Sequence, residues 1–284
     1  MATYTTLIDA PTLAARLGDP HWLVVDARFD LADSSAGERA YAEGHIPGAV
    51  YAHLDRDLSS DRALAISGGR HPLPTRENAA KQLAALGIGD DTQVIAYDAA
   101  GGMFAARLWW MLRWIGHEAV AVLDGGWPAW QRANLPSETG PVRATSTSHT
   151  LTLRAPLAQR VDVQSVMNNL ETQAAMVLDA RAPDRYDGSN ETIDPIGGHI
   201  PGARNAFFKD NLEADGRFKS PDVLRARFDA LTRAQPVIHQ CGSGVTACHN
   251  LLAMTHVGLD AGVLYSGSWS EWVEDAARPV ARGR

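Results

Sequence analysis

At 284 residues with 45% hydrophobic content, the chain is long enough for two domains with ordinary hydrophobic cores. Its formal net charge of −7 argues against nucleic acid or an anionic membrane surface as a partner. Two cysteines cannot build a disulfide framework, no apolar run reaches the roughly 18 residues of a membrane span, and the N-terminus lacks the basic region of a signal peptide. We therefore expect a cytoplasmic protein whose partners include neither nucleic acid nor a membrane.

In chain order, short apolar runs alternate with helical patterns. Buried strands are predicted at residues 23–26, 94–97 and 119–123, with a further strand beginning at 236–238. Helices are predicted at 103–115, where three tryptophans should face the core, and at 245–254. Strands that alternate with helices are typical of an α/β fold with parallel sheets.

The sequence also repeats itself over a long period. The segment VVDAR at 24–28 recurs as VLDAR at 177–181, and GHIPGA at 44–49 recurs at 198–203. A repeat of this length indicates tandem domains and not a solenoid. Because residues 135–148 are rich in Pro, Gly, Ser and Thr, we predict a first domain at 1–134, a linker at 135–154 and a second domain at 155–284.

Features that both halves share are expected to be structural. By this criterion the Ile, Pro and Gly of the two GHIPGA segments form a turn into a strand, and His45 and His199 are structural and not catalytic bases. The Asp-x-Arg pairs are expected to be buried ion pairs that hold loops. Features present in one half only are candidates for function.

Cys241 is the main feature that the halves do not share, because Asp98 stands at the matching position. Cys241 follows a predicted strand and precedes Gly242, Ser243 and Gly244, and the predicted helix starts at Val245. The N–H groups of such a loop converge on an anion, and the helix dipole adds positive potential. Hydrogen bonds to a charged group contribute about 1.5–3 kcal/mol each and the dipole about 0.3–1 kcal/mol, so the loop should be the main cause of a stable thiolate.

The first half also carries extra residues between its GHIPGA segment and Asp98. They fall within 54–74, a stretch that includes Asp55 and His71. We expect this stretch to cover the pocket of the other half.

Together, the tandem halves, the GHIPGA segments, the loop CGSGVT at 241–246 and GSWSEW at 267–272 resemble the two-domain rhodanese family of sulfurtransferases, most closely its 3-mercaptopyruvate branch. The resemblance implies two rhodanese-like domains, each a mostly parallel sheet flanked by helices. It implies that Cys241 forms a persulfide, that the first domain is catalytically silent, and that no cofactor or metal takes part.

The resemblance also assigns roles to residues around the cysteine. Ser243, His71 and Asp55 match a Ser–His–Asp set, and Arg185 matches the first of two arginines that hold a substrate carboxylate. The position of the second arginine falls near Thr192, so one contact is expected to be missing. The remaining substrate-binding residues are those of the loop itself, Gly242, Gly244, Val245 and Thr246.

The expected reaction moves a sulfane sulfur from 3-mercaptopyruvate, a small anionic donor, to a thiol or cyanide, with a thioredoxin-like protein as one candidate acceptor. Thiosulfate is the alternative donor. A phosphatase of the Cys-x5-Arg type would need an arginine where Ala247 stands, and His239, Cys241, Cys248 and His249 lack the spacing of a zinc site. A non-enzymatic binding module would be plausible if both halves lacked the cysteine, but only the first half lacks it.

Overall fold

The computed structural model describes residues 3–141 and 149–283, which form two compact units. Unit 1 comprises the described residues of 3–60, 74–158 and 212–218, and unit 2 comprises 61–73, 159–211 and 219–283. The described part of the predicted linker belongs to unit 1, and its residues 142–148 lie outside the described residues.

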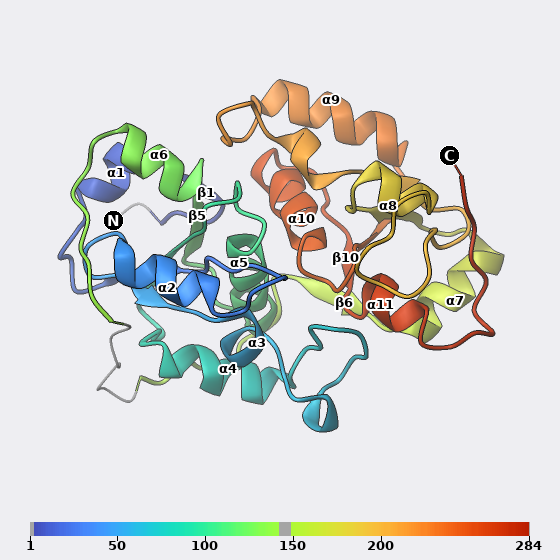
Figure 1. Cartoon of the computed structure of the whole chain (residues 1–284), viewed down its shortest axis with the longest axis horizontal. Helices are drawn as coiled ribbons and strands as arrows, with labels where there is room; N and C mark the ends of the chain where they lie inside the picture. The colour runs from blue at the N-terminus through green and yellow to red at the C-terminus, as the bar shows by residue number, and fades with distance from the viewer. Residues whose placement is uncertain (1–2, 142–148, 284) are drawn as a thin grey trace. The chain divides into compact units, whose positions relative to one another are not determined.

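Unit 1 contains five strands and six α-helices within its described residues (Figure 1). The strands are β1 (Leu7–Ile8), β2 (Trp22–Asp26), β3 (Val50–Tyr51), β4 (Gln93–Tyr97) and β5 (Val120–Leu123). The helices are α1 (Ala10–Ala14), α2 (Ala36–Glu43), α3 (Leu54–Asp57), α4 (Arg76–Ala85), α5 (Ala105–Ile115) and α6 (Gly126–Arg132).

Unit 2 repeats this plan over its own described residues. Its strands are β6 (Gln159–Val161), β7 (Met176–Asp179), β8 (Arg204–Asn205), β9 (Val237–Gln240) and β10 (Val263–Tyr265). Its α-helices are α7 (Val163–Thr172), α8 (Pro183–Asp187), α9 (Pro221–Thr232), α10 (Ala247–His256) and α11 (Ser268–Trp272), and its 3-10 helices are η1 (Arg62–Leu64) and η2 (Phe208–Asn211).

In the described part of the chain each unit has one five-stranded sheet, ordered β1-β5-β4-β2-β3 in unit 1 and β6-β10-β9-β7-β8 in unit 2. All of these strand pairs are parallel; for example, Asp26 pairs with Tyr97 and Asp179 with Gln240. The predicted α/β fold with parallel sheets is confirmed. Because the carboxyl ends of parallel strands meet at one edge, residues that follow β7 and β9 come together there.

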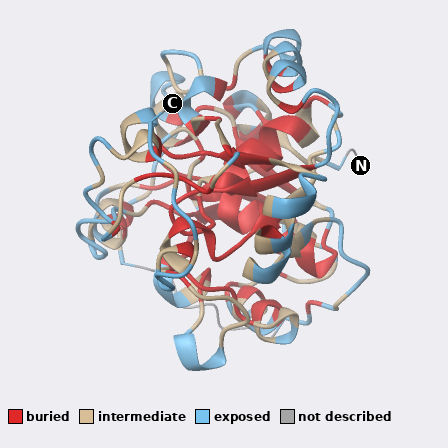
Figure 2. Ribbon diagram, turned by 90° about the vertical axis from the view of Figure 1, so that its right-hand side faces the viewer, coloured by how far each residue is buried: buried red, intermediate tan, exposed pale blue. Residues whose placement is uncertain are grey.

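The central strands are buried because helices cover both faces of each sheet. All five residues of β4 are buried, and so are Trp109, Trp110 and Trp114 of α5, which confirms that these tryptophans belong to the core. In unit 2, α10 packs against β9 and β10. Figure 2 shows the strands in red and the outer turns of several helices in pale blue. No helix among residues 3–141 and 149–283 has the length and apolar character needed to cross a membrane.

The shared motifs have structural roles, as expected. Arg28 and Arg181 pair with Asp26 and Asp179 at 2.5 and 2.6 Å, and each arginine also donates to a backbone carbonyl oxygen, that of Gly44 or of Gly198. The two histidines stack on tyrosine rings, His45 on Tyr41 and His199 on Tyr186, with ring centroids 3.8 and 3.9 Å apart. These contacts fix the loops around each sheet.

Each half of the chain contributes one segment to the other half's unit. Residues 61–73, from the first half, belong to unit 2, where the N–H groups of Gly68 and Gly69 donate to Glu271 and Glu274. Residues 212–218, from the second half, belong to unit 1, where the Phe218 N–H donates to Asp124. We call these the exchanged segments.

Candidate active site

Cys241 is the first residue after β9, at the carboxyl edge of the unit 2 sheet, and it is 1% exposed. Its N–H donates to Ser268 Oγ at 3.1 Å, and its carbonyl oxygen accepts from the Trp269 N–H at 2.9 Å. Both partners lie at the start of α11. The backbone of the cysteine is therefore held between the strand that precedes it and a short helix.

The loop after Cys241 is two residues longer than predicted. We predicted a helix from Val245, but α10 begins at Ala247, so Val245 and Thr246 remain in the loop. Gly244 has a φ of +73°, and a β-carbon there would lie 2.2 Å from the carbonyl oxygen of Ser266. Only glycine fits this position without moving the backbone.

The structure brings His71 and Ser243 together. His71 Nδ1 lies 2.7 Å from Ser243 Oγ, and both side chains are buried, 3% and 6% exposed. His71 lies on the exchanged segment 61–73, as we expected for a residue that covers the pocket of the other half. A serine hydroxyl joined to an imidazole beside a cysteine can pass a proton to or from a bound substrate.

Arg185, on α8, lies beside the loop and is held by two carboxylates. Its Nε donates to Glu191 at 3.0 Å, and its Nη2 donates to Asp194 Oδ2 at 2.9 Å. Burial raises the pKa of the Glu191 carboxyl, but hydrogen bonds from Arg185 and from the Asp194 and Ile193 N–H groups outweigh it, so the pKa is lowered. Glu191 is therefore ionised and balances the guanidinium.

Arg70 is a site residue that the sequence motifs did not indicate. Its Nη1 donates to Asp194 Oδ1 at 2.7 Å, and its backbone N–H donates to Ser270 Oγ. A β-carbon on Gly242 would lie 3.3 Å from Arg70 Nη2 and 3.5 Å from both Nη atoms of Arg185. The resemblance indicated one arginine beside this loop, Arg185, and the structure places Arg70 there as well. The only signal in the sequence is that Arg70 directly precedes His71.

The family resemblance also pointed to Thr192 and Asp55. Thr192 is exposed on the loop between Glu191 and Asp194. Asp55 lies on α3 of unit 1, where its N–H donates to His53 Nδ1. Its pairing with His71 stays a prediction.

The sequence was then compared with known proteins. A family model described as a rhodanese-like domain matches residues 9–133 and again residues 162–275. The chain belongs to the rhodanese-like family. The family resemblance that the motifs indicated is thereby confirmed.

Rhodanese-like relatives match almost the whole chain. A Pseudomonas aeruginosa protein named as a probable 3-mercaptopyruvate sulfurtransferase is 47% identical over 281 residues, covering 98% of each chain. The thiosulfate sulfurtransferase of Mus musculus is 35% identical, covering 96% of this chain and 93% of the relative. The structure of SseA from Escherichia coli, described as a 3-mercaptopyruvate sulfotransferase, has 33% identity and a TM-score of 0.80, and the match covers 94% of this chain and 100% of that one.

The rhodanese-like fold of unit 1 fills its own anion site with a carboxylate. Asp98 follows β4 as Cys241 follows β9, and its two oxygens accept from four backbone N–H groups at 2.7–2.9 Å, those of Ala100, Gly102, Phe104 and Ala105. This arrangement demonstrates that the loop between strand and helix can hold an anion in this fold.

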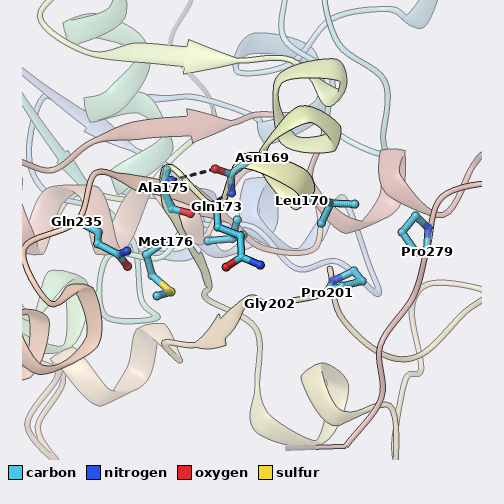
Figure 3. Close-up of a pocket in the computed structure, with 10 residues that line it drawn as sticks. Asn169, Leu170, Gln173, Ala175, Met176, Pro201, Gly202, Gln235 and Pro279 are labelled. Carbon is cyan, nitrogen blue, oxygen red and sulfur yellow. Dashed lines mark hydrogen bonds between the residues drawn. The ribbon is translucent and has the colours of Figure 1, made fainter.

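One cavity of unit 2 lies away from the carboxyl edge of the sheet, where Cys241 is found. It has a volume of about 440 Å³ and includes Asn169, Gln173 and Met176 in its lining (Figure 3). Met176 is the first residue of β7 and pairs with Val237 at the start of β9. The cavity therefore lies at the amino ends of these strands, whereas Cys241 follows the carboxyl end.

Proposed function

We propose that the protein is a sulfurtransferase that moves sulfur from 3-mercaptopyruvate to a thiol or cyanide through a persulfide on Cys241. The observation that carries the proposal is the buried Ser243–His71 hydrogen bond beside the cysteine loop. Support also comes from the relatives, whose names include both 3-mercaptopyruvate and thiosulfate sulfurtransferases.

In the first step the Cys241 thiolate attacks the sulfur of 3-mercaptopyruvate, and a sulfur–sulfur bond forms. The carbon–sulfur bond breaks, its electron pair stays on carbon, and pyruvate leaves as an enolate. That carbon needs a proton to become the methyl group of pyruvate. The donor's own thiol proton can reach it through Ser243 and His71, which leaves the persulfide as an anion.

In the second step an acceptor takes the outer sulfur. Cyanide or a thiolate attacks it, the sulfur–sulfur bond breaks, and the electron pair returns to Cys241 as a thiolate. The products are thiocyanate or a new persulfide. This is the chemistry of thiol–disulfide exchange with a sulfane sulfur in transit. A loop that binds anions stabilises the thiolate and the persulfide alike.

Thiosulfate is the second candidate donor, and the pair of guanidinium groups beside Gly242 favours it. Thiosulfate is a dianion, and its leaving group, sulfite, needs no proton. Proton transfer through Ser243 and His71 would then have no role. The donor is decided by the ratio of kcat/KM for 3-mercaptopyruvate and thiosulfate with cyanide as the common acceptor.

The persulfide is tested by mass spectrometry after incubation with 3-mercaptopyruvate and no acceptor. We expect one added sulfur atom on the Cys241 peptide and none in the Cys241→Ser variant. Cys248, the second buried cysteine, is the internal control. Sulfur on Cys248, or on neither cysteine, would overturn the proposal.

The relay is tested with His71→Ala and Ser243→Ala. Loss of proton transfer should slow turnover of 3-mercaptopyruvate by about a hundredfold or more. Turnover of thiosulfate should change much less, since sulfite leaves without a proton. Equal slowing with both donors would show that His71 and Ser243 only support the loop.

A further inference from the structure

The short helix α11 holds the backbone of the cysteine loop. Its first two residues, Ser268 and Trp269, bind the N–H and the carbonyl oxygen of Cys241. The next residue, Ser270, donates its N–H to the carbonyl oxygen of Gly242 at 2.8 Å. Three consecutive residues of the helix are thus bonded to two consecutive residues of the loop. The place of the loop relative to α11 is therefore fixed.

Side chains of the same helix hold the exchanged segment 61–73. Ser270 Oγ accepts from the Arg70 N–H at 3.0 Å, and Glu271 Oε1 accepts from the Gly68 N–H at 2.6 Å. Both bonds run from backbone N–H groups of the segment to side chains of α11. Substitution of these side chains should therefore release the segment and leave the cysteine loop in place.

The helix and the segment approach each other so closely that glycine is needed on both sides. A β-carbon on Gly68 would lie 2.8 Å from Glu271 Oε1, and one on Gly69 would lie 2.7 Å from Ser270 Oγ. Gly267 has no room for a β-carbon, because the Glu271 carboxylate folds back over it. These contacts account for three residues of the GSWSEW motif, to which the sequence had assigned no role.

His71 belongs to a part of the segment that closes on itself. The Ile66 N–H donates to the carbonyl oxygen of Leu73 at 2.9 Å, and the Leu73 N–H donates to Ser67 Oγ at 3.1 Å. Between these ends, His71 points its Nδ1 at Ser243 Oγ, 2.7 Å away. The imidazole is thus carried by a closed loop whose outer side is bonded to α11.

Ser270 joins the two parts of the site within one residue. Its N–H binds Gly242, which directly follows Cys241. Its Oγ binds the N–H of Arg70, which directly precedes His71. The separation of the cysteine and the imidazole therefore depends on the Ser270 side chain. Proton transfer is sensitive to such a separation, because donor and acceptor must come within about 2.6–3.2 Å of each other.

We propose that Ser270 and Glu271 are positioning residues, which hold the exchanged segment 61–73 on α11 so that His71 stays bonded to Ser243 beside the cysteine. This inference rests on the proposed function, in which that pair carries a proton. Both residues act through the backbone of the segment. They should therefore matter most for 3-mercaptopyruvate, whose leaving group needs a proton, and little for thiosulfate.

Donor kinetics of Ser270→Ala, Glu271→Ala and Glu271→Gln test this role, with cyanide as the acceptor. Each alanine variant should lower kcat/KM for 3-mercaptopyruvate about tenfold, because a small displacement of His71 impairs proton transfer. The value for thiosulfate should change by less than about twofold. Glu271→Gln keeps an oxygen that accepts from Gly68 and should restore most of the loss. Equal losses with both donors, or a Glu271→Gln variant as slow as Glu271→Ala, would overturn the inference.

Hydrogen exchange followed by mass spectrometry tests the same contacts without a sulfur donor. In both alanine variants, amides within 66–73 should exchange about tenfold faster than in the wild type, because the segment has lost a bond to α11. Amides of α10 should keep their wild-type rates, which would confine the change to the segment. Wild-type exchange within 66–73 in both variants would refute the positioning role.

Glu213→Ala is the matched control, because Glu213 is an exposed glutamate on the other exchanged segment, 212–218. Its kinetic constants and its exchange within 66–73 should match those of the wild type. The proposed function and this inference fail in different experiments. A wild type that takes no sulfur from 3-mercaptopyruvate would refute the proposed function, and hydrogen exchange would then decide whether Ser270 and Glu271 hold the segment.

Discussion

His239 lies two residues before Cys241 on β9, and its side chain is completely buried. Burial lowers the pKa of its imidazole from 6.5 to about 3, so the ring is neutral in the folded protein. The unfolded chain binds a proton below pH 6.5 that the folded chain does not bind. Folding stability should therefore fall as the pH drops from 6.5 towards 3, by about 1.4 kcal/mol per pH unit.

The His239→Asn variant tests this acid sensitivity. Its free energy of unfolding in urea should be lower at pH 7, but it should change less between pH 7 and pH 5 than that of the wild type, by about 2 kcal/mol. Gln164→Asn, at an exposed position without a titratable group, should keep the wild-type pH dependence. An identical pH dependence in wild type and His239→Asn would contradict the prediction.

Individual site residues differ in how far the sequence could predict them. Cys241 and its loop were identified because the chemistry depends on neighbouring residues, and His71 because it lies in a stretch that the other half lacks. Arg70 was missed because its partners, Asp194 and Ser270, are 124 and 200 positions away along the chain. No local pattern encodes such contacts.

At the scale of elements, the loop after β4 begins with Asp98, whereas the loop after β9 begins with Cys241. In the loop after β4, the backbone N–H groups donate to the side-chain carboxylate of Asp98, which occupies the place of an external anion. An amide would offer one acceptor oxygen in place of two. Asp98→Asn should therefore lower the free energy of unfolding by about 1–3 kcal/mol, while kcat at 25 °C stays at the wild-type value. Thermal unfolding and donor kinetics check the two parts separately.

The same loop predicts that unit 1 cannot be converted into an active site by one change. Asp98→Cys combined with Cys241→Ser should have no measurable turnover. Leu212 packs against Gly101 in the loop after Asp98, so that a β-carbon on Gly101 would lie 2.4 Å from Leu212 Cδ1. This packing leaves little space for a donor beside the loop. Turnover near the wild-type level in this double variant would show that a cysteine alone makes the site.

Elements themselves were largely predictable. The strands at 23–26, 94–97 and 119–123 and the helix at 103–115 were found within two residues of their observed ends, because buried runs and helical periodicity are local signals. The start of α10 was placed too early, since the glycines of an anion loop do not mark where helical hydrogen bonding begins.

For the whole molecule, comparison of the two halves predicted two parallel-sheet domains and a stretch of the first half that covers the second, but not the reciprocal segment 212–218. Hydrophobic patterns indicate which residues are buried, and not against which half of the chain they pack. The N–H contacts of Gly68 and Gly69 to Glu271 and Glu274 involve groups that no periodicity would pair.

Separate expression of the two halves tests the exchange. A fragment starting within 142–148 lacks residues 61–73, and with them Arg70 and His71. It should have no turnover of 3-mercaptopyruvate alone and should regain turnover when co-expressed with the first half. The matched control is the intact chain with a protease site inserted within 142–148 and cleaved after folding, which should stay active. A second half that is fully active alone would contradict the prediction.

The exchanged segments also impose an order on biosynthesis. Residues 3–141 leave the ribosome well before residues 212–218 are synthesised. Unit 1 is therefore complete only after a late part of the chain has been made. Unit 2 needs residues 61–73, which are made early and must stay available. We therefore expect that neither half completes its folding alone during translation and that truncation of either half destabilises the other. This mutual dependence gives the first half of the chain a structural role in completing unit 2, whatever its part in the chemistry.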